Sequence, residues 1–258
     1  MTVIAVIPAR FGSTRFPGKP LHMIAGIPMV ERVRRLAAAA PSIDRVLVAT
    51  DDERICEVVE GFGGEAVMTP QSCRNGTERA YEAVKAFARA DDVIINLQGD
   101  APLTPPWVIE AVAEAMIEEP GLDLATPATA LTEDAYAKLA SAKAVGEVGG
   151  TTVVFDKAMN ALYFSKTIIP FRREDAGVAI YKHIGLYAYR FSALARFVAL
   201  EPGPLERTES LEQLRALENA IPIRIVLTEY RGRTPWSVDS PRDAEIAADI
   251  IAREGEIV

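Results

Sequence analysis

Three positive charges stand on one short loop near the start of the chain. The first 30 residues contain no Asp or Glu, although the whole chain has a net charge of −8. An apolar run leads into a loop over residues 8–20, whose only charges are Arg10, Arg15 and Lys19. Glycines let a backbone approach a ligand closely, and amides in such turns donate to phosphate oxygens. The loop therefore predicts a site for a polyanion; the alternative is a solvated basic loop beside a core strand.

Two well-known phosphate loops are excluded by counting. A Walker loop has four residues between its glycines and a Ser or Thr after its lysine. Here five residues separate Gly12 from Gly18, and Pro20 follows Lys19. The dinucleotide fingerprint G-x-G-x-x-G is also absent from this loop. Any ligands for a metal ion must therefore come from other segments.

Two carboxylates are placed to hold a hard cation. A nearly continuous apolar strand over 92–97 ends in Gln98-Gly99-Asp100, so Asp100 stands at a strand tip. Asp239 lies in a turn just before a helix expected to begin near Pro241. Mg²⁺ prefers one or two carboxylates together with phosphate oxygens and water. From the residues alone, a cap or turn residue is the alternative for Asp100, and a helix N-cap is the leading interpretation for Asp239.

Two further segments have both a functional and a structural interpretation. Arg74, Asn75 and Gly76 open a helix directly after a strand, so their amides could grip a base or a phosphate, or Thr77 could simply cap the helix. His183 is one of two histidines and lies in a stretch of alternating polarity. A lone histidine in a strand is more often structural.

Composition limits the class of protein. A chain of 258 residues with 49% hydrophobic residues can bury the core of one large domain. No apolar run approaches the ~20 residues of a membrane span, and the N-terminus lacks the pattern of a signal peptide. Two cysteines are too few for a disulfide framework, which makes the cytoplasm the expected compartment. The acidic balance argues against a nucleic-acid partner.

Alternating patterns predict an α/β fold with a doubly wound, mostly parallel sheet and an antiparallel β-rich flap, formed by a single domain over 1–258. Ligands of such sheets gather outside the carboxyl ends of the strands. That rule places the basic loop, residues 50–52 and residues 98–102 along one edge. The expected strands are 2–7, 43–50, 64–68, 92–97, 151–155, 161–164, 180–189 and 221–229, and the expected helices are 28–40, 52–61, 76–89, 191–200, 205–219 and a last one after Pro241.

Taken together, these segments resemble the 3-deoxy-manno-octulosonate cytidylyltransferases (CMP-Kdo synthetases). Residues 7–21 fit the family pattern Ile-Pro-Ala-Arg-x-x-Ser-Thr-Arg-x-Pro-Gly-Lys-Pro-Leu nearly residue for residue. The similarity continues through 48–51, 76–79, 98–100, 161–170, 183–190, 204–215 and 238–241. It covers essentially the whole chain and implies a nucleotidyltransferase-type fold, with a nucleotide-binding half over about 1–130 and a sugar-binding and dimerisation half over about 131–258.

The resemblance also implies the reaction. CMP would pass from CTP to the anomeric hydroxyl of a 3-deoxy-2-keto sugar acid, with release of pyrophosphate, for lipopolysaccharide or capsule synthesis by a homodimer. Mg²⁺ would be the cofactor. The implied residues are Arg10, Lys19 and Arg15 for the triphosphate; Pro8, Ala9, Arg74, Asn75, Gly76 and Gln98 for cytosine and ribose; Asp100 and Asp239 for Mg²⁺; and His183, Tyr187, Glu212 and Gln213 for the sugar.

The sequence departs from the family pattern on the sugar side. Ala101 replaces a glutamate, and Lys166 and Lys182 stand where arginine is usual. An Asn-x-Val-Lys segment is missing, and Thr151-Thr-Val-Val stands in its place after an apparent insertion over 145–150. The acceptor therefore stays open among Kdo, 8-amino-Kdo, Kdn and sialic-type acids. A nucleotide-binding relative without turnover is the rival from another class.

Overall fold

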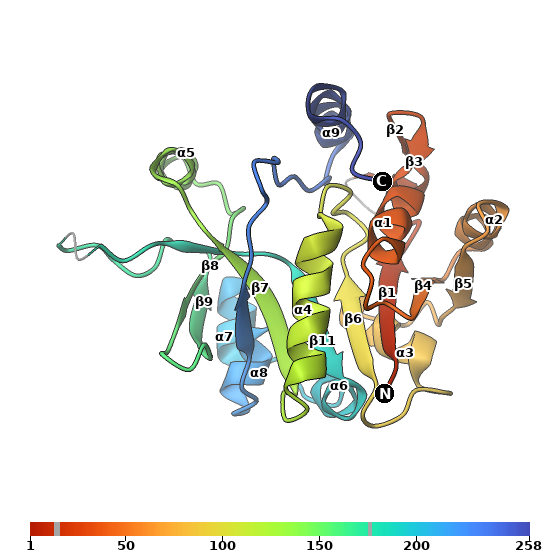
Figure 1. The fold of residues 1–258 in the computed structure, drawn as a ribbon, viewed down its shortest axis with the longest axis horizontal. Helices are drawn as coiled ribbons and strands as arrows, with labels where there is room; N and C mark the ends of the chain where they lie inside the picture. The colour runs from red at the N-terminus through yellow and green to blue at the C-terminus, as the bar shows by residue number, and fades with distance from the viewer. Residues whose placement is uncertain (13–15, 175–176) are drawn as a thin grey trace.

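One ten-stranded sheet runs through the molecule, and helices cover both of its faces (Figure 1). This computed structural model describes residues 1–12, 16–174 and 177–258. The strand order is β5-β4-β1-β6-β11-β7-β10-β8-β9, and β12 pairs with β7 outside this path. No helix within the described ranges is long and apolar enough to cross a membrane.

The first half of the chain forms the parallel part of the sheet. β1 (Val3–Ala9) pairs in parallel with β4 (Arg45–Thr50) and β6 (Val93–Leu97), and β4 pairs in parallel with β5 (Glu65–Met68). β1 and β6 are nearly continuous apolar runs because both faces of these central strands are buried. The prediction of a parallel α/β sheet is thereby confirmed. Since β1, β4 and β6 run in one direction, their carboxyl ends share one edge.

The second half adds the antiparallel part. β11 (Leu186–Arg190) lies antiparallel between β6 and β7 (Leu124–Ala130). Outside β7, β10 (Tyr181–His183), β8 and β9 continue the antiparallel pairing. The predicted β-rich flap is confirmed, although the strand expected over 180–189 is two strands. The antiparallel part also reaches the middle of the sheet because β11 inserts beside β6.

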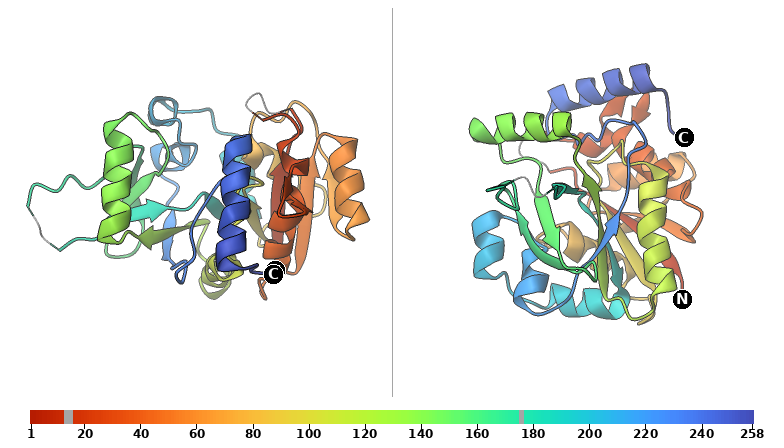
Figure 2. Two further views of the ribbon diagram at one scale, coloured as in Figure 1. Left: turned by 90° about the horizontal axis from the view of Figure 1, so that it is seen from above. Right: turned by 60° about the vertical axis from the view of Figure 1, so that its left-hand side comes forward.

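Helices lie against both faces of the sheet (Figure 2), and a hydrophobic layer fills the space between the helices and each face. Helices α1 (Met29–Ala38), α2 (Glu53–Gly61) and α4 (Pro106–Glu118) pack on one face. Helices α3 (Gly76–Val84) and α6 (Phe191–Val198) pack on the other. Each fully buried Leu, Ile or Phe side chain in such layers contributes roughly 1.5–3 kcal/mol. The layers therefore hold the strand ends, and the loops attached to them, in fixed positions.

Two expected helices differ from the structure. The helix expected over 76–89 is shorter, because α3 ends at Val84 and the side chain of Phe87 beyond it is 44% exposed. The helix expected over 205–219 is broken because Ser210 adopts the left-handed conformation, with φ of 51°.

A third apolar cluster fixes the last helix, α9 (Pro241–Glu254), over the basic loop. Phe16 and Met29 pack there against Val238 and Ala244. This packing brings the segment just before α9 to the carboxyl edge of the sheet. The remaining elements are η1 (Lys19–Leu21), β2 (Met23–Ile24), β3 (Ile27–Pro28), α5 (Glu133–Ala144), β8 (Thr152–Phe155), β9 (Ala161–Ser165), α7 (Pro204–Glu209), α8 (Leu214–Glu218) and β12 (Arg224–Leu227).

Candidate functional site

A cleft of about 340 Å³ opens at the carboxyl ends of β1 and β6. It gathers all the residues predicted for the nucleotide and the metal except Arg15, which lies outside the described residues. The lining residues are Pro8, Ala9, Arg10, Lys19, Pro20, Met29, Cys73, Arg74, Asn75, Gly76, Arg79, Gln98, Gly99, Asp100 and Asp239. Segments more than 200 residues apart in the chain thus meet in one site.

Lys19 connects the two predicted metal ligands. Its Nζ lies 3.0 Å from Asp100 Oδ2 and 3.5 Å from Asp239 Oδ1, and it donates to the carbonyl of Val238 at 2.9 Å. The amide of Val238 also donates to the carbonyl of Asp100 at 2.9 Å, which ties the two acidic segments together. The carboxylates of Asp100 and Asp239 therefore both lie at ion-pair distance from the ammonium group of Lys19, which belongs to the basic loop.

Asp239 is not the N-cap of α9. That position belongs to Ser240, whose hydroxyl accepts from the amide of Asp243. Asp243 completes a capping box by accepting from the amide of Ser240. The interpretation of Asp239 as the N-cap was therefore wrong by one residue. The carboxylate of Asp239 is turned toward Lys19 instead.

The carboxylate pair fits a magnesium ion better than a transition metal. Within the described part of the chain, no group of three or more His, Cys, Asp or Glu side chains could hold a metal ion. Two carboxylates alone leave most of an octahedral shell to phosphate oxygens and water, which is the ligand set that Mg²⁺ accepts. Asp100 and Asp239 are 35% and 50% exposed, so solvent and a ligand can both reach them.

Close packing shapes the floor of the cleft. A Cβ atom at Gly99 would stand 2.7 Å from the carbonyl oxygen of Pro8, and one at Gly76 would stand 3.1 Å from Pro8 Cγ. A side chain at Gly99 would therefore push the ends of β1 and β6 apart. The two glycines let three backbone segments line the cleft side by side.

The first turn of α3 forms one wall. The side chain of Asn75 caps this helix by accepting from the amide of Glu78 at 2.8 Å. The amide of Arg74 donates to Glu78 Oε2 at 2.7 Å, which fixes the turn. The N-cap of α3 is thus Asn75, so the interpretation of Thr77 as the cap was wrong, and Thr77 is buried. Capping leaves Arg74, Asn75 and Gly76 facing the cleft.

Arg79 and Cys73 line the cleft, although sequence reasoning assigned them no role in it. Arg79 is 4% exposed and donates to Asp51 at 2.8 Å and to Thr69 at 2.6 Å, so it joins α3 to the ends of β4 and β5. The sequence could have pointed to Arg79, because it ends the Gly-Thr-Glu-Arg segment over 76–79 that resembles the family. Burial raises the pKa of the Cys73 thiol, which keeps it protonated and unsuited to act as a nucleophile.

His183 and Tyr187, predicted for the sugar, are buried behind this cleft. Nε2 of His183 lies 2.8 Å from the hydroxyl of Thr126, and its ring packs edge-on against Phe164. Burial lowers the pKa of His183 to about 3, so the imidazole is neutral. Burial, with the nearby charge of Glu212, raises the pKa of Tyr187 and keeps its hydroxyl protonated.

Glu212 and Gln213 belong to a buried polar layer below α3. Glu212 Oε2 accepts from the hydroxyl of Thr77 at 2.7 Å, and Asn96 donates to the same hydroxyl at 3.1 Å. Gln213 Nε2 and Asn96 Oδ1 are buried without a hydrogen-bond partner among the described residues, and Glu212 Oε1 has only an ion pair with Arg215 Nη2 at 3.6 Å. Buried polar atoms normally find hydrogen-bond partners, so these atoms indicate a place for a polar ligand or for water.

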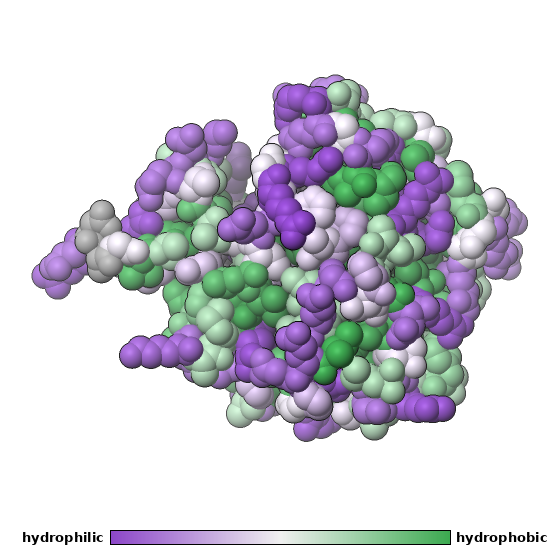
Figure 3. Space-filling view, viewed as in Figure 1, coloured by the Kyte–Doolittle hydropathy of each residue, from purple (hydrophilic) through white to green (hydrophobic). Residues whose placement is uncertain are grey.

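The structure brings the predicted residues together as two adjoining sets. The nucleotide and metal residues line one cleft. The sugar residues form the polar layer behind it, joined to it where Gly185 approaches the side chain of Gln98. On the surface, the molecule is hollowed between the lobe that carries α5 and the lobe that carries α9 (Figure 3).

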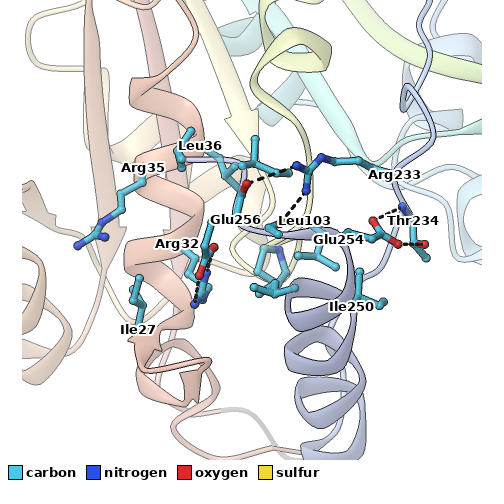
Figure 4. Close-up of a pocket in the computed structure, with 15 residues that line it drawn as sticks. Ile27, Arg32, Arg35, Leu36, Leu103, Arg233, Thr234, Ile250, Glu254 and Glu256 are labelled. Atoms are coloured by element: carbon cyan, nitrogen blue, oxygen red, sulfur yellow. Dashed lines mark hydrogen bonds and ion pairs between the residues drawn. The ribbon is translucent and has the colours of Figure 1, made fainter.

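A second hollow between α1 and α9 is structural. The C-terminal tail fills it, leaving a cavity of about 20 Å³. Arg32 donates to Glu256 at 2.8 Å, and Glu254 accepts from both the amide and the hydroxyl of Thr234 (Figure 4). Since these polar groups already pair with one another, the hollow offers little to a ligand.

Comparison with known proteins identifies the class. A family model described as cytidylyltransferase matches residues 4–225, so the chain belongs to the cytidylyltransferases. It is 63% identical over 259 residues, covering all of both chains, to the 3-deoxy-manno-octulosonate cytidylyltransferase of Maricaulis maris (strain MCS10). This match confirms the family resemblance seen in the sequence.

Two further relatives broaden the comparison. The chain is 42% identical over 248 residues, 95% of this chain and 97% of the other, to the 8-amino-3,8-dideoxy-manno-octulosonate cytidylyltransferase of Shewanella halifaxensis (strain HAW-EB4). It superimposes with a TM-score of 0.88 on a structure of CMP:2-keto-3-deoxy-manno-octonic acid synthetase complexed with CTP. That match has 36% identity and covers 98% of this chain and all of the other.

Proposed function

We propose that the protein transfers CMP from CTP to the anomeric hydroxyl of Kdo or a close variant, with release of pyrophosphate, in the synthesis of lipopolysaccharide or capsule. The observation that carries this proposal is the convergence of Lys19, Asp100 and Asp239 in a cleft lined by the basic loop. The relatives named for Kdo and 8-amino-Kdo support the acceptor class.

The basic loop would hold the triphosphate. Arg10 and Lys19 line the cleft as cations, with Arg15 as a further candidate on the same loop. The backbone at Pro8 and Ala9 would contact cytosine and ribose together with Gln98 and the turn over 74–76. The backbone at Pro8 and Ala9 and the turn over 74–76 are fixed by the end of β1 and by the cap of α3, so binding would require little reorganisation of these two segments.

Asp100 and Asp239 would hold Mg²⁺. The ion would neutralise phosphate charge and so assist departure of pyrophosphate. In the ligand-free protein, the ammonium of Lys19 offsets the repulsion between the two acids. When Mg²⁺ and CTP bind, Lys19 would exchange its carboxylate contacts for phosphate oxygens. The lysine can make this exchange because its three donors rotate about a flexible stem.

The reaction is an in-line displacement. The oxygen of the anomeric hydroxyl forms a bond to the α-phosphorus, the bond from that phosphorus to the bridging oxygen breaks so that pyrophosphate leaves, and the hydroxyl proton passes to water. Such chemistry depends on positioning and on stabilisation of charge. His183, Tyr187, Glu212 and Gln213 would orient the sugar, and the buried atoms Gln213 Nε2 and Asn96 Oδ1, which have no hydrogen-bond partner among the described residues, support this role.

We also propose a homodimer formed through the second half of the chain. Several large apolar side chains are exposed there; Phe171 is 87% exposed and Leu162 is 62% exposed. Figure 3 shows apolar atoms gathered over β7 and β12. Sedimentation of the wild type and of Phe171→Asp would test this, with a shift to monomer expected for the variant and two monomeric samples contradicting the proposal.

The proposed function is tested by pyrophosphate release with CTP, Mg²⁺ and a panel of acids: Kdo, 8-amino-Kdo, Kdn and N-acetylneuraminate. We expect the highest kcat/KM with Kdo or 8-amino-Kdo, and a preference for CTP over UTP and ATP. A clear preference for N-acetylneuraminate would contradict the acceptor assignment. CTP binding without pyrophosphate release for any acid would favour the rival, a nucleotide-binding relative without turnover.

A further inference from the structure

An aromatic ring and an arginine beside the cleft hold two points of the basic loop together. Phe11 directly follows Arg10 in the chain, and Gly18 directly precedes Lys19. These neighbours are the two cations expected to hold the triphosphate. We propose that Arg54 of α2, stacked on the ring of Phe11, is a positioning residue that sets the spacing of these two cations for CTP. This inference rests on the proposed function and extends it to a side chain that does not line the cleft.

The backbone closes on itself at Phe11 and Gly18. The amide of Gly18 donates to the carbonyl of Phe11 at 3.0 Å. Gly18 adopts the left-handed conformation, with φ of 70°, and a Cβ there would stand 3.2 Å from Phe11 Cε2 and Cζ. The ring therefore packs closely against the backbone of Gly18. Since Gly18 is the residue before η1, the position of the ring fixes where η1, and with it Lys19, begins.

The guanidinium group of Arg54 covers the same ring. Its Cζ lies 3.4 Å from the centroid of the Phe11 ring. A guanidinium this close to the face of an aromatic ring is attracted by the π electrons of the ring. The stacked arginine therefore keeps the ring in the position where it meets Gly18.

Arg54 is itself fixed to the end of β4. Its Nε and Nη2 donate to Asp52 Oδ1 and Oδ2 at 2.9 and 2.6 Å, and this pair of bonds sets the plane of the guanidinium. Asp52 also caps α2 by accepting from the amide of Arg54, and its own amide donates to the hydroxyl of Thr50. Helix α2 packs against β4 and β5 (Figure 1). A continuous set of contacts therefore runs from the end of β4 to the basic loop.

The surroundings of Arg54 suit positioning better than direct binding of phosphate. The carboxylate of Asp52 balances the charge of Arg54, so the pair adds little net charge beside the cleft. The arginine side chain is 58% exposed, so its removal takes nothing from the hydrophobic core. A cation stacked on a ring at an exposed site corresponds to about a two- to fivefold change in an equilibrium constant. Loss of the stack would therefore loosen the loop without unfolding the protein.

The test is Arg54→Gln, with Arg45→Gln as the matched control. Arg45 also lies over a ring, that of Phe87 at 4.7 Å, and also pairs with a carboxylate, that of Glu65. It stands at the start of β4, at the opposite end of the strand from the cleft. For Arg54→Gln we expect the Kd for CTP, measured by calorimetry, to rise about two- to fivefold, while KM for Kdo and Tm stay at their wild-type values. Arg45→Gln should bind CTP like the wild type.

A double-mutant cycle with Phe11→Leu separates positioning from a direct effect of the arginine charge on CTP. Phe11→Leu removes the ring and should weaken CTP binding by itself. The double variant should have the same Kd as Phe11→Leu alone, because Arg54 acts only through the ring. Losses that multiply in the double variant, or an unchanged Kd for Arg54→Gln, would overturn the inference and leave the proposed function standing. If the wild type does not bind CTP, the proposed function fails and the inference fails with it.

Discussion

Gly99→Ala should damage both stability and nucleotide binding through a single steric contact. The added Cβ would stand 2.7 Å from the carbonyl oxygen of Pro8, about 0.8 Å inside the ~3.5 Å separation at which non-bonded atoms attract best. The partner is backbone at the end of β1, which is buried and paired on both sides, so it cannot simply rotate away. Relief therefore requires β1 and β6 to separate at the cleft.

Forced overpacking of this kind costs roughly 1–3 kcal/mol. For a chain of this size, 1 kcal/mol corresponds to about 2–4 °C in Tm. We expect Gly99→Ala to lower Tm by roughly 2–12 °C and to weaken CTP binding, because Pro8 and Gln98 line the cleft beside it. Thermal unfolding and calorimetry with CTP measure the two effects.

Gly121→Ala is the matched control. A Cβ there would meet no atom within 4 Å, and the residue is exposed in the turn after α4. Its Tm and CTP affinity should match the wild type. If Gly99→Ala behaved like this control, the backbone contact at the floor of the cleft would not constrain the site, and the close-packing argument would be refuted.

Other substitutions test separate parts of the site. Asp100→Asn and Asp239→Asn should each nearly abolish pyrophosphate release at saturating Mg²⁺ while Tm changes little; wild-type rates would refute the ligand assignment. Arg10→Ala and Lys19→Ala should each weaken CTP binding roughly tenfold to a hundredfold, the value of a hydrogen bond to a charged group, and unchanged calorimetry in both would contradict the triphosphate site. Since burial lowers the pKa of His183 to about 3 from ~6.5 when unfolded, the folded protein binds fewer protons between these values. The free energy of unfolding should therefore fall by up to about 1.4 kcal/mol per pH unit below pH 6.5. Denaturant titrations should show a shallower slope for His183→Gln, and an equal slope would count against a buried neutral imidazole.

Much of the nucleotide cleft could be predicted from the sequence. The basic loop and Asp100 each come directly after an apolar strand, and the loops after parallel strands meet at the same edge of the sheet. Asp239 was harder to place because Asp and Ser are both good N-caps. The sequence pattern could not decide whether Asp239 or its neighbour Ser240 is the N-cap of the last helix. The tertiary contact with Lys19, 220 residues earlier in the chain, settles the direction of the carboxylate.

The sequence over residues 101–150 gave no clear signal for its helices and strands. Helix α5 buries none of its residues, so it lacks the apolar stripe that marks an amphipathic helix. Strand β7 reads Leu-Ala-Thr-Pro-Ala-Thr-Ala, with a proline and small residues in place of a β-branched run.

The most direct test of the proposed reaction follows the phosphorus atoms of CTP. The protein is incubated with Mg²⁺, Kdo and CTP labelled at either the α- or the γ-phosphate. Attack on the α-phosphorus predicts that the α-label moves into the sugar nucleotide and the γ-label leaves as pyrophosphate. Transfer of the γ-label to the sugar, or release of the γ-label as single phosphate with no sugar nucleotide formed, would contradict it.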